Sequence, residues 1–131
     1  MARTSRDLAR VDYDDATSRE TPLATIPDFR RTALSFPEAT ESAHMGHPDF
    51  RVRNKVFASL GVPDAAWGMV KLTPEQQDML MAAEPAAFKP AAGAWGRRGS
   101  THVLLAAIDR TTLRSALGMA WRNTAPKGLA S

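Results

Sequence analysis

Apolar residues recur at helical spacing in three segments of the chain, and each segment follows a residue that can cap a helix. The capping residues are Thr25, Thr73 and Asp109. The strongest signal is Thr73-Pro74-Glu75-Gln76, because proline suits the first helical position and Gln76 can complete a capping box. The predicted helices cover residues 26–36, 74–84 and 110–122, and Pro37 is expected to end the first of them. Their predicted buried residues are Ile26, Phe29, Ala33 and Leu34 in the first, Leu80 and Ala83 with Gln76 in the second, and Leu113, Ala116, Leu117, Ala120 and Trp121 in the third.

Between the first two helices, short apolar stretches alternate with polar residues, as is typical of strands. The segment from Asp49 to Leu60 is predicted to form a β-hairpin around a two-residue turn at Asn54 and Lys55. The predicted cross-strand pairs are Val52 with Phe57 and Phe50 with Ser59. The other predicted strands cover residues 40–45, 65–72 and 101–108, with turns at residues 46–48 and 61–64 and a long loop at residues 85–99.

This order of elements predicts an α+β fold, a twisted antiparallel sheet packed by about three helices. The consecutive strands are too close in sequence for parallel crossovers. At 131 residues the chain is long enough for one domain with one core. We expect residues 1–24 to form a flexible arm, because they are polar and lack a sustained period, and residues 25–131 to form the domain. The segment after residue 122 is expected to fray.

Composition and charge narrow the possible functions. The chain has no cysteine, which excludes disulfides, thiolate metal sites and a cysteine nucleophile. No apolar run approaches the length of a membrane span, and the first residues lack a secretory apolar region, so the expected location is cytoplasmic. The net charge is +3, but from Lys89 onward seven basic residues accompany only one acid, Asp109. This asymmetry favours a polyanionic or acidic partner.

Candidate catalytic and metal sites are weak. His44, His47 and Asp49 are close in sequence, but Gly46 and Pro48 interrupt the spacing, and a turn-lining role is expected. A triad of Ser100, His102 and Asp109 lacks the glycine frame of a nucleophile elbow. The glycines at 93, 96 and 99 lack the lysine and serine of a phosphate-binding loop. We therefore expect no metal, no cofactor and no enzymatic activity.

Cationic residues instead cluster in two segments. Arg51, Arg53 and Lys55 lie on the predicted hairpin, and Arg97 and Arg98 lie in the glycine-containing loop. Two protruding elements with cationic tips could straddle a sugar-phosphate backbone and bind it without base specificity. The alternative is that these side chains are simply solvated.

The tryptophans allow two interpretations. In the loop, Trp95 could stack on a base or sugar, but we expect it, like Trp67 and Trp121, to lie in the core. A second hypothesis is a small-molecule-binding or resistance-type protein. In that case a pocket would be lined by Trp67, Trp95, Met69, Met79 and Met81.

Several motifs together resemble the MmcQ/YjbR-like family over about residues 25–128. They are residues 33–41 (ALSFPEATE), Phe50-Arg51-Val52 with residues 55–58 (KVFA), Val70-Lys71-Leu72, residues 94–99 (AWGRRG) before an apolar strand, and residues 113–121 with Ala125-Pro126-Lys127. The resemblance implies a CyaY-like fold and DNA binding through a "double wing" of strand-loop elements. Carried onto this sequence, the wings are the hairpin with Arg51, Arg53 and Lys55 and the loop with Arg97 and Arg98. The expected partner is DNA, the expected state a monomer or weak dimer, and no membrane contact is expected.

Overall fold

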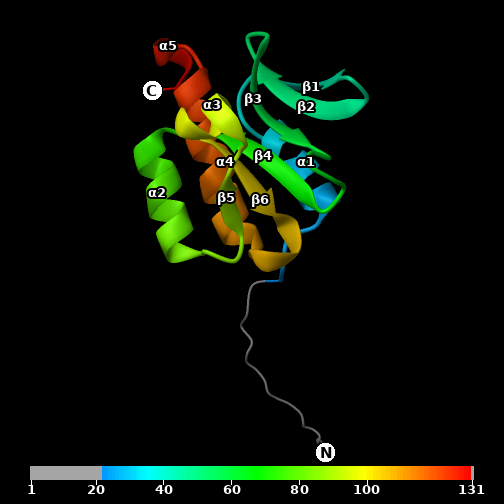
Figure 1. Ribbon diagram of the computed structural model, residues 1–131. Coiled ribbons are helices and arrows are strands. Elements are labelled where there is room, and N and C mark those ends of the chain that lie inside the picture. The colour runs from blue at the N-terminus through cyan, green and yellow to red at the C-terminus, as the bar shows by residue number, and fades with distance from the viewer. Residues whose placement is uncertain (1–21, 131) are drawn as a thin grey trace, which may run out of the picture.

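The computed structural model describes residues 22–130, which form one six-stranded antiparallel sheet with helices around it (Figure 1). The strand order is β1-β2-β3-β4-β6-β5, and every neighbouring pair is antiparallel. The predicted α+β fold with an antiparallel sheet is confirmed. The strands are β1 (Ala39–His44), β2 (His47–Val52), β3 (Lys55–Leu60), β4 (Trp67–Lys71), β5 (Phe88–Pro90) and β6 (Ser100–Leu104).

The three predicted helices are all present, and their caps form as expected. Thr25 and Thr73 each complete a capping box, and the Asp109 carboxylate accepts a hydrogen bond from the Thr112 N–H. Two further short helices, α3 and α5, were not predicted. The helices are α1 (Ile26–Leu34), α2 (Pro74–Ala83), α3 (Gly93–Arg97), α4 (Arg110–Thr124) and α5 (Lys127–Ala130).

One face of the sheet is buried and the other is left open. α4 packs on β3 and β4, α1 packs on α4 and β1, and α2 lies beside β5 at one edge (Figure 1). Under α1 and α4, the alternate side chains of the strands are fully buried with the predicted stripe of α4. The largest buried side chains are Phe29, Phe50, Phe57, Ile108, Leu113 and Leu117. The alternation that buries these residues turns their strand neighbours toward the open face.

The predicted hairpin register is wrong. The turn falls at Arg53 and Asn54, with φ of 50° and 68°, rather than at Asn54 and Lys55. Both central residues of this turn have positive φ, a conformation that asparagine adopts more readily than most residues with a Cβ. Val52 consequently lies opposite Lys55.

A bulge explains the rest of the hairpin. The pairing shifts between Phe50 and Arg51, so that Phe50 lies opposite Ala58 and Arg51 opposite Val56, leaving Phe57 as the extra residue. Phe57 and Ala58 are consecutive and both fully buried, which simple strand alternation does not allow. The bulge lets both Phe57 and Ala58 face the core, while Val56 and Ser59 on either side of them face the groove side of the sheet.

Other local predictions also need correction. The first hairpin turns at Met45 and Gly46, so His47 and Pro48 are part of β2. The predicted loop at residues 85–99 contains β5 and α3, and the last predicted strand gives way to a 3₁₀ turn at residues 105–107. Ile26 and Leu34, predicted as core, are each 39% exposed at the two ends of α1. Within α2, Leu80 is buried as predicted, but Gln77 is the other buried residue, while Gln76 is half-buried and Ala83 is exposed.

The predicted arm of residues 1–24 lies mostly outside the described residues, which begin at Pro22. Leu23 forms a β-bridge with Asp109, and Ala24 is buried. The backbone N–H of Arg110 donates to the Pro22 carbonyl. At the other end, the expected fraying segment contains α5, whose Leu129 packs against the core. None of the helices within residues 22–130 is long and apolar enough to cross a membrane.

We predict opposite effects of adding a methyl group at two buried glycines. A Cβ at Gly68 on β4 would come within 2.6 Å of the Phe29 ring, so Gly68→Ala should lower the free energy of unfolding by about 1–3 kcal/mol. A Cβ at Gly118 on α4 would make only ordinary contacts at 3.5–3.6 Å, so Gly118→Ala should raise it by about 0.5–1 kcal/mol. Urea denaturation of both variants measures these changes. An unchanged midpoint for Gly68→Ala would mean that the Phe29 ring moves aside without cost.

Candidate functional site

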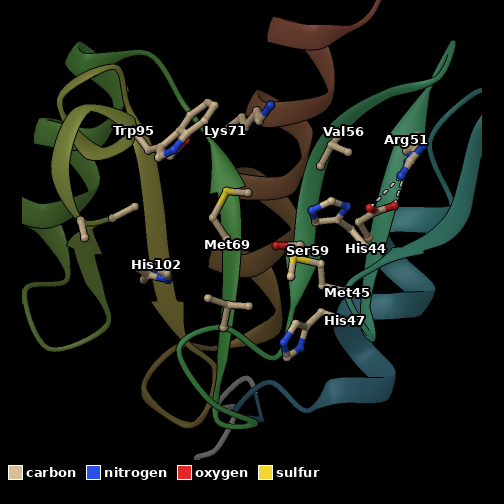
Figure 2. Close-up of a pocket in the computed structure, with 15 residues that line it drawn as sticks. His44, Met45, His47, Arg51, Val56, Ser59, Met69, Lys71, Trp95 and His102 are labelled. Carbon is tan, nitrogen blue, oxygen red and sulfur yellow. Dashed lines mark hydrogen bonds and ion pairs between the residues drawn. The ribbon is translucent and has the colours of Figure 1, made fainter.

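The open face of the sheet is hollowed into a groove of about 640 Å³ (Figure 2). We call it the open-face groove. Its lining comes from β1, β2, β3, β4 and β6, the loop after β3, and the segment that leads into α3. The long helices α1 and α4 lie behind the strands in Figure 2, and α3 lies at one edge of the groove, where it carries Trp95. The groove is therefore accessible from solvent.

Strand register explains the floor of the groove. Asp49, Ser59, Met69 and His102 lie in one row across β2, β3, β4 and β6, each opposite the next in the pairing. All four line the groove. Because directly paired residues share a face of the sheet, this register fixes the row on the side away from α1 and α4.

Apolar side chains form the rim. Met45, at the turn between β1 and β2, is 85% exposed, and Val62, in the loop after β3, is 41% exposed. On the other side Trp95 of α3 is 62% exposed, and Figure 2 shows its indole beside Lys71. An exposed indole and thioether around one hollow form an apolar surface that water solvates poorly.

Close backbone contacts hold α3 in place. A Cβ at Gly96 would lie 1.8 Å from the Ala91 carbonyl oxygen, and one at Gly99 would lie 1.9 Å from the Leu72 carbonyl oxygen. Gly99 also has φ of +114°, a conformation that residues with a Cβ rarely adopt. Gly96 thus allows α3 to pack against the backbone that follows β5, and Gly99 allows the chain after α3 to lie against the end of β4.

A buried amide adds a second anchor. Gln77 of α2 is 6% exposed, and its Nε2 lies within hydrogen-bond distance of the Gly96 carbonyl (3.0 Å), the Ser100 carbonyl (3.2 Å) and the Thr101 hydroxyl (3.1 Å). An amide without these partners would be costly to bury. Gln77 thus links α2 to the residues that follow Trp95.

The predicted hairpin arginines are both engaged by carboxylates. Arg51 donates to Asp49 from Nε at 2.9 Å and from Nη2 at 3.0 Å, and Asp49 is only 3% exposed. Arg53 donates to both carboxylate oxygens of Glu38, which precedes β1. The hydrogen bonds raise the pKa of both guanidinium groups, and the bond from Arg53 lowers the pKa of the Glu38 carboxyl. Of the two, only Arg51 lines the groove.

The other three predicted cations are not paired with a carboxylate of the described residues. Lys55, Arg97 and Arg98 are exposed, and none forms an ion pair within residues 22–130. The guanidinium carbon of Arg98 lies 5.9 Å from the centre of the Trp95 ring. The structure thus brings Arg51 and Trp95 to one groove, while Lys55, Arg97 and Arg98 lie outside its lining.

A protein-family model for YjbR matches residues 34–123. The chain belongs to the YjbR family. Its fold also resembles the crystal structure of protein DR2400 from Deinococcus radiodurans, described as a DUF419 domain. The TM-score is 0.67 with 19% sequence identity over 79% of this chain and 80% of that chain. At this identity the likeness concerns the fold alone. No curated protein matches the chain.

Two of the three tryptophan predictions fail in this YjbR chain. Trp121 is buried as expected, and its Nε1 donates to the Pro37 carbonyl at 3.0 Å. Trp95 is exposed because Gly96 and Gly99 occupy the side of the segment that contacts the backbone of the domain. Trp67 is half-buried on the open face, with the Lys89 ammonium 4.5 Å from its ring centre.

The sequence identified only some of the residues that line the groove. Met69 was expected to line a pocket, and it does, but Met79 and Met81 of α2 and Trp67 do not line the groove. Met45 and Lys71 were not singled out, since nothing local marks a turn methionine or a strand lysine as part of a site. Strand alternation does assign Lys71 to the same face as Met69.

The histidines do not assemble a metal site in the described part of the chain. His44 and His47 lie opposite each other across the first turn, but residues 22–130 contain no group of three His, Cys, Asp or Glu side chains that could hold an ion. The carboxylate of Asp109 caps α4. His102 lies in the groove floor, edge-on to Trp67, and its Nδ1 is buried without a hydrogen-bond partner.

We predict that His102 makes the stability of this YjbR domain fall as the pH is lowered. Burial lowers the pKa of His102 below its ordinary 6.5; a hydrogen bond involving the Val62 backbone opposes the shift, and the charge of Lys89 adds to it. The unfolded chain therefore takes up a proton near pH 6.5 while the folded chain does not, so stability is lost as the pH falls below about 6.5.

Urea denaturation between pH 7.5 and 5 should show that the free energy of unfolding declines less steeply with falling pH in His102→Gln than in the parent. The two slopes should differ by the uptake of at most one proton. Lys89→Met should raise the pKa of the folded histidine, which NMR titration of the His102 ring can follow. A His102 resonance that titrates at or above 6.5 in the folded protein would contradict the prediction.

Proposed function

We propose that this YjbR chain is a binding module for a small, flat, largely apolar molecule with an anionic group, held in the open-face groove. The observation that carries the proposal is the exposed indole of Trp95 beside a cation, Lys71, at a hollow of about 640 Å³. Hollows of this size with apolar walls and a few polar groups are the usual form of small-molecule sites.

The apolar part of the ligand would lie between the rim residues. A tryptophan that is 62% exposed offers a rigid face on which an aromatic ring can stack, and little side-chain entropy is lost when it does. Met45 and Met69 are flexible and polarizable, so they can adapt to ligands of different outline. Covering these side chains would remove apolar surface from water, which is the main source of affinity.

The anionic part of the ligand would be recognised at one end of the groove. Lys71 lies beside Trp95 at the end of β4 in Figure 2, and Arg51 is held against Asp49 farther across the sheet. Because Asp49 already offsets the charge of Arg51, Lys71 supplies the unbalanced positive charge in the lining. A ligand stacked on Trp95 would therefore place its anionic group at Lys71.

We expect naphthalene-2-sulfonate to bind this groove, as measured by backbone-amide NMR titration of the full chain. Trp95→Ala should weaken binding about tenfold or more, equivalent to about 1.4 kcal/mol. Lys71→Gln should weaken the sulfonate several-fold but leave the neutral 2-naphthalenemethanol unchanged. The matched control is Met79→Ala, an exposed methionine of α2 outside the groove, which should bind as the parent does.

Shifts spread over the whole surface, or equal affinity in Trp95→Ala, would reject the groove as the site. If Lys71→Gln weakened the binding of the sulfonate and of the alcohol equally, Lys71 would not recognise the anionic group. The apolar part of the site would be unaffected by that result.

A second candidate is binding to the DNA backbone by the basic wings. The observation that favours it is that the β2–β3 hairpin and α3 contribute Val56 and Trp95 to the same groove, so Lys55 and the Arg97–Arg98 pair stand on segments that border it. Arg51 and Arg53 would have to exchange Asp49 and Glu38 for phosphates, which reduces their expected gain. Both proposals assign the chain a binding role without catalysis.

For the DNA candidate, we expect weak binding to duplex DNA that falls steeply between 50 and 200 mM salt. Replacing Lys55, Arg97 and Arg98 together by glutamine should reduce the slope of log K against log salt by roughly 0.9 for each lost phosphate contact. Replacing Arg51 and Arg53 should matter less, and Arg122→Gln on α4 is the control. Undetectable binding at low salt, or a slope unaffected by the triple change, would reject this candidate.

A further inference from the structure

A second cleft, of about 260 Å³, lies between α1 and α4 on the helical side of the molecule. It has no part in the open-face groove. All six lining residues are polar or charged, and they include three arginines but a single carboxylate. The residues are Asp28, Arg31, Thr32, Arg110, Thr111 and Arg114.

Asp28 organises two of the arginines. Its side chain is 4% exposed; Oδ1 accepts a hydrogen bond from Nη2 of Arg31, and Oδ2 accepts one from Nε of Arg110 at 3.0 Å. Burial raises the pKa of Asp28, but hydrogen bonds from Thr25 and Arg110 outweigh it, so the pKa lies below the ordinary value. One ionised carboxylate therefore holds two guanidinium groups from different helices beside each other.

The cleft retains unused donors and excess charge. Each of the two paired arginines gives Asp28 one of its nitrogens, and their side chains remain 69% and 53% exposed. Arg114 has no ion pair or side-chain hydrogen bond with any described residue. Three positive charges against one negative charge leave a surplus of two. Guanidinium forks with free N–H groups are the usual partners of phosphate oxygens.

We infer that this cleft is a binding site for a phosphate dianion, either inorganic phosphate or the terminal group of a phosphate monoester. Arg31, Arg110 and Arg114 supply the charge, and the hydroxyls of Thr32 and Thr111 supply further donors. The charge surplus of two matches a dianion. A cleft of about 260 Å³ is large enough for a phosphate group, and its polar and charged lining residues differ from the apolar rim of the groove.

The site depends on side chains rather than on the amide groups at the start of α4. The N–H of Arg110 donates to the Pro22 carbonyl, and that of Thr112 donates to Asp109. Substituting an arginine should therefore remove binding without altering the helix. Arg114 is the best choice because it has no partner among the described residues to lose.

The test is a backbone-amide NMR titration of the full chain with inorganic phosphate at pH 7.5, with ionic strength held constant by sodium chloride. We expect saturable shifts around residues 28–32 and 110–114 at millimolar phosphate. Arg114→Gln should weaken binding at least threefold, and Arg110→Lys should weaken it because lysine lacks the planar fork. The control is Arg122→Gln, farther along the same helix and outside the cleft, which should leave binding unchanged.

Two further ligands test whether the site requires a dianion. Phenyl phosphate, a monoester dianion, should bind as inorganic phosphate does, whereas dimethyl phosphate, a monoanion, should bind at least several-fold more weakly. Equal binding of dimethyl phosphate would overturn the assignment to a dianion. Shifts that do not saturate, or that are the same in Arg114→Gln, would overturn the site itself. Either failure leaves the naphthalene sulfonate experiment unaffected, because the two sites share no residue.

Discussion

The contact between the Phe29 ring and the backbone of Gly68 determines how α1 lies on the sheet. A side chain at position 68 would overlap the ring, so the helix can approach β4 only because this residue is glycine. Phe29 also packs against Phe50 of β2, with ring centres 5.8 Å apart. Since Gly68 and Val70 must face the helices, Met69 and Lys71 must face the other way. The floor of the groove is thus a direct consequence of core packing.

Elements with local signals were predictable, and those set by tertiary contacts were not. The caps at Thr25, Thr73 and Asp109 depend on residues three positions away, so the sequence alone located all three long helices. α3 has five residues and two glycines, which give no apolar period, and its place depends on Gly96 approaching the Ala91 carbonyl. No local pattern reveals that the glycine side faces inward. The exposure of Trp95 was therefore missed.

In the candidate site, too, some features follow from local sequence and others from tertiary contacts. Arg53 and Lys55 of the hairpin are exposed, whereas Arg51 is partly buried against Asp49. The partner of Arg53 is Glu38, fifteen positions away, and a bulge decides which side chains of β3 are buried. A one-residue shift changes every cross-strand pair, and the sequence contains two plausible turns at Arg53-Asn54 and Asn54-Lys55. Membership of the YjbR family and the α+β fold were predictable because they depend on the pattern of the whole chain.

Carboxylates position arginines on both faces, with different consequences. Asp49 is nearly buried and takes two hydrogen bonds from one arginine, so Arg51 becomes a fixed polar wall with little net charge. Asp28 is equally buried but divides its two oxygens between Arg31 and Arg110, so each guanidinium keeps donors and the cluster keeps its charge. The first arrangement suits a groove whose affinity comes from apolar contact and one lysine, and the second suits a cleft whose affinity is electrostatic. The number of arginines on each buried carboxylate thus distinguishes the two sites more clearly than the overall charge of the chain.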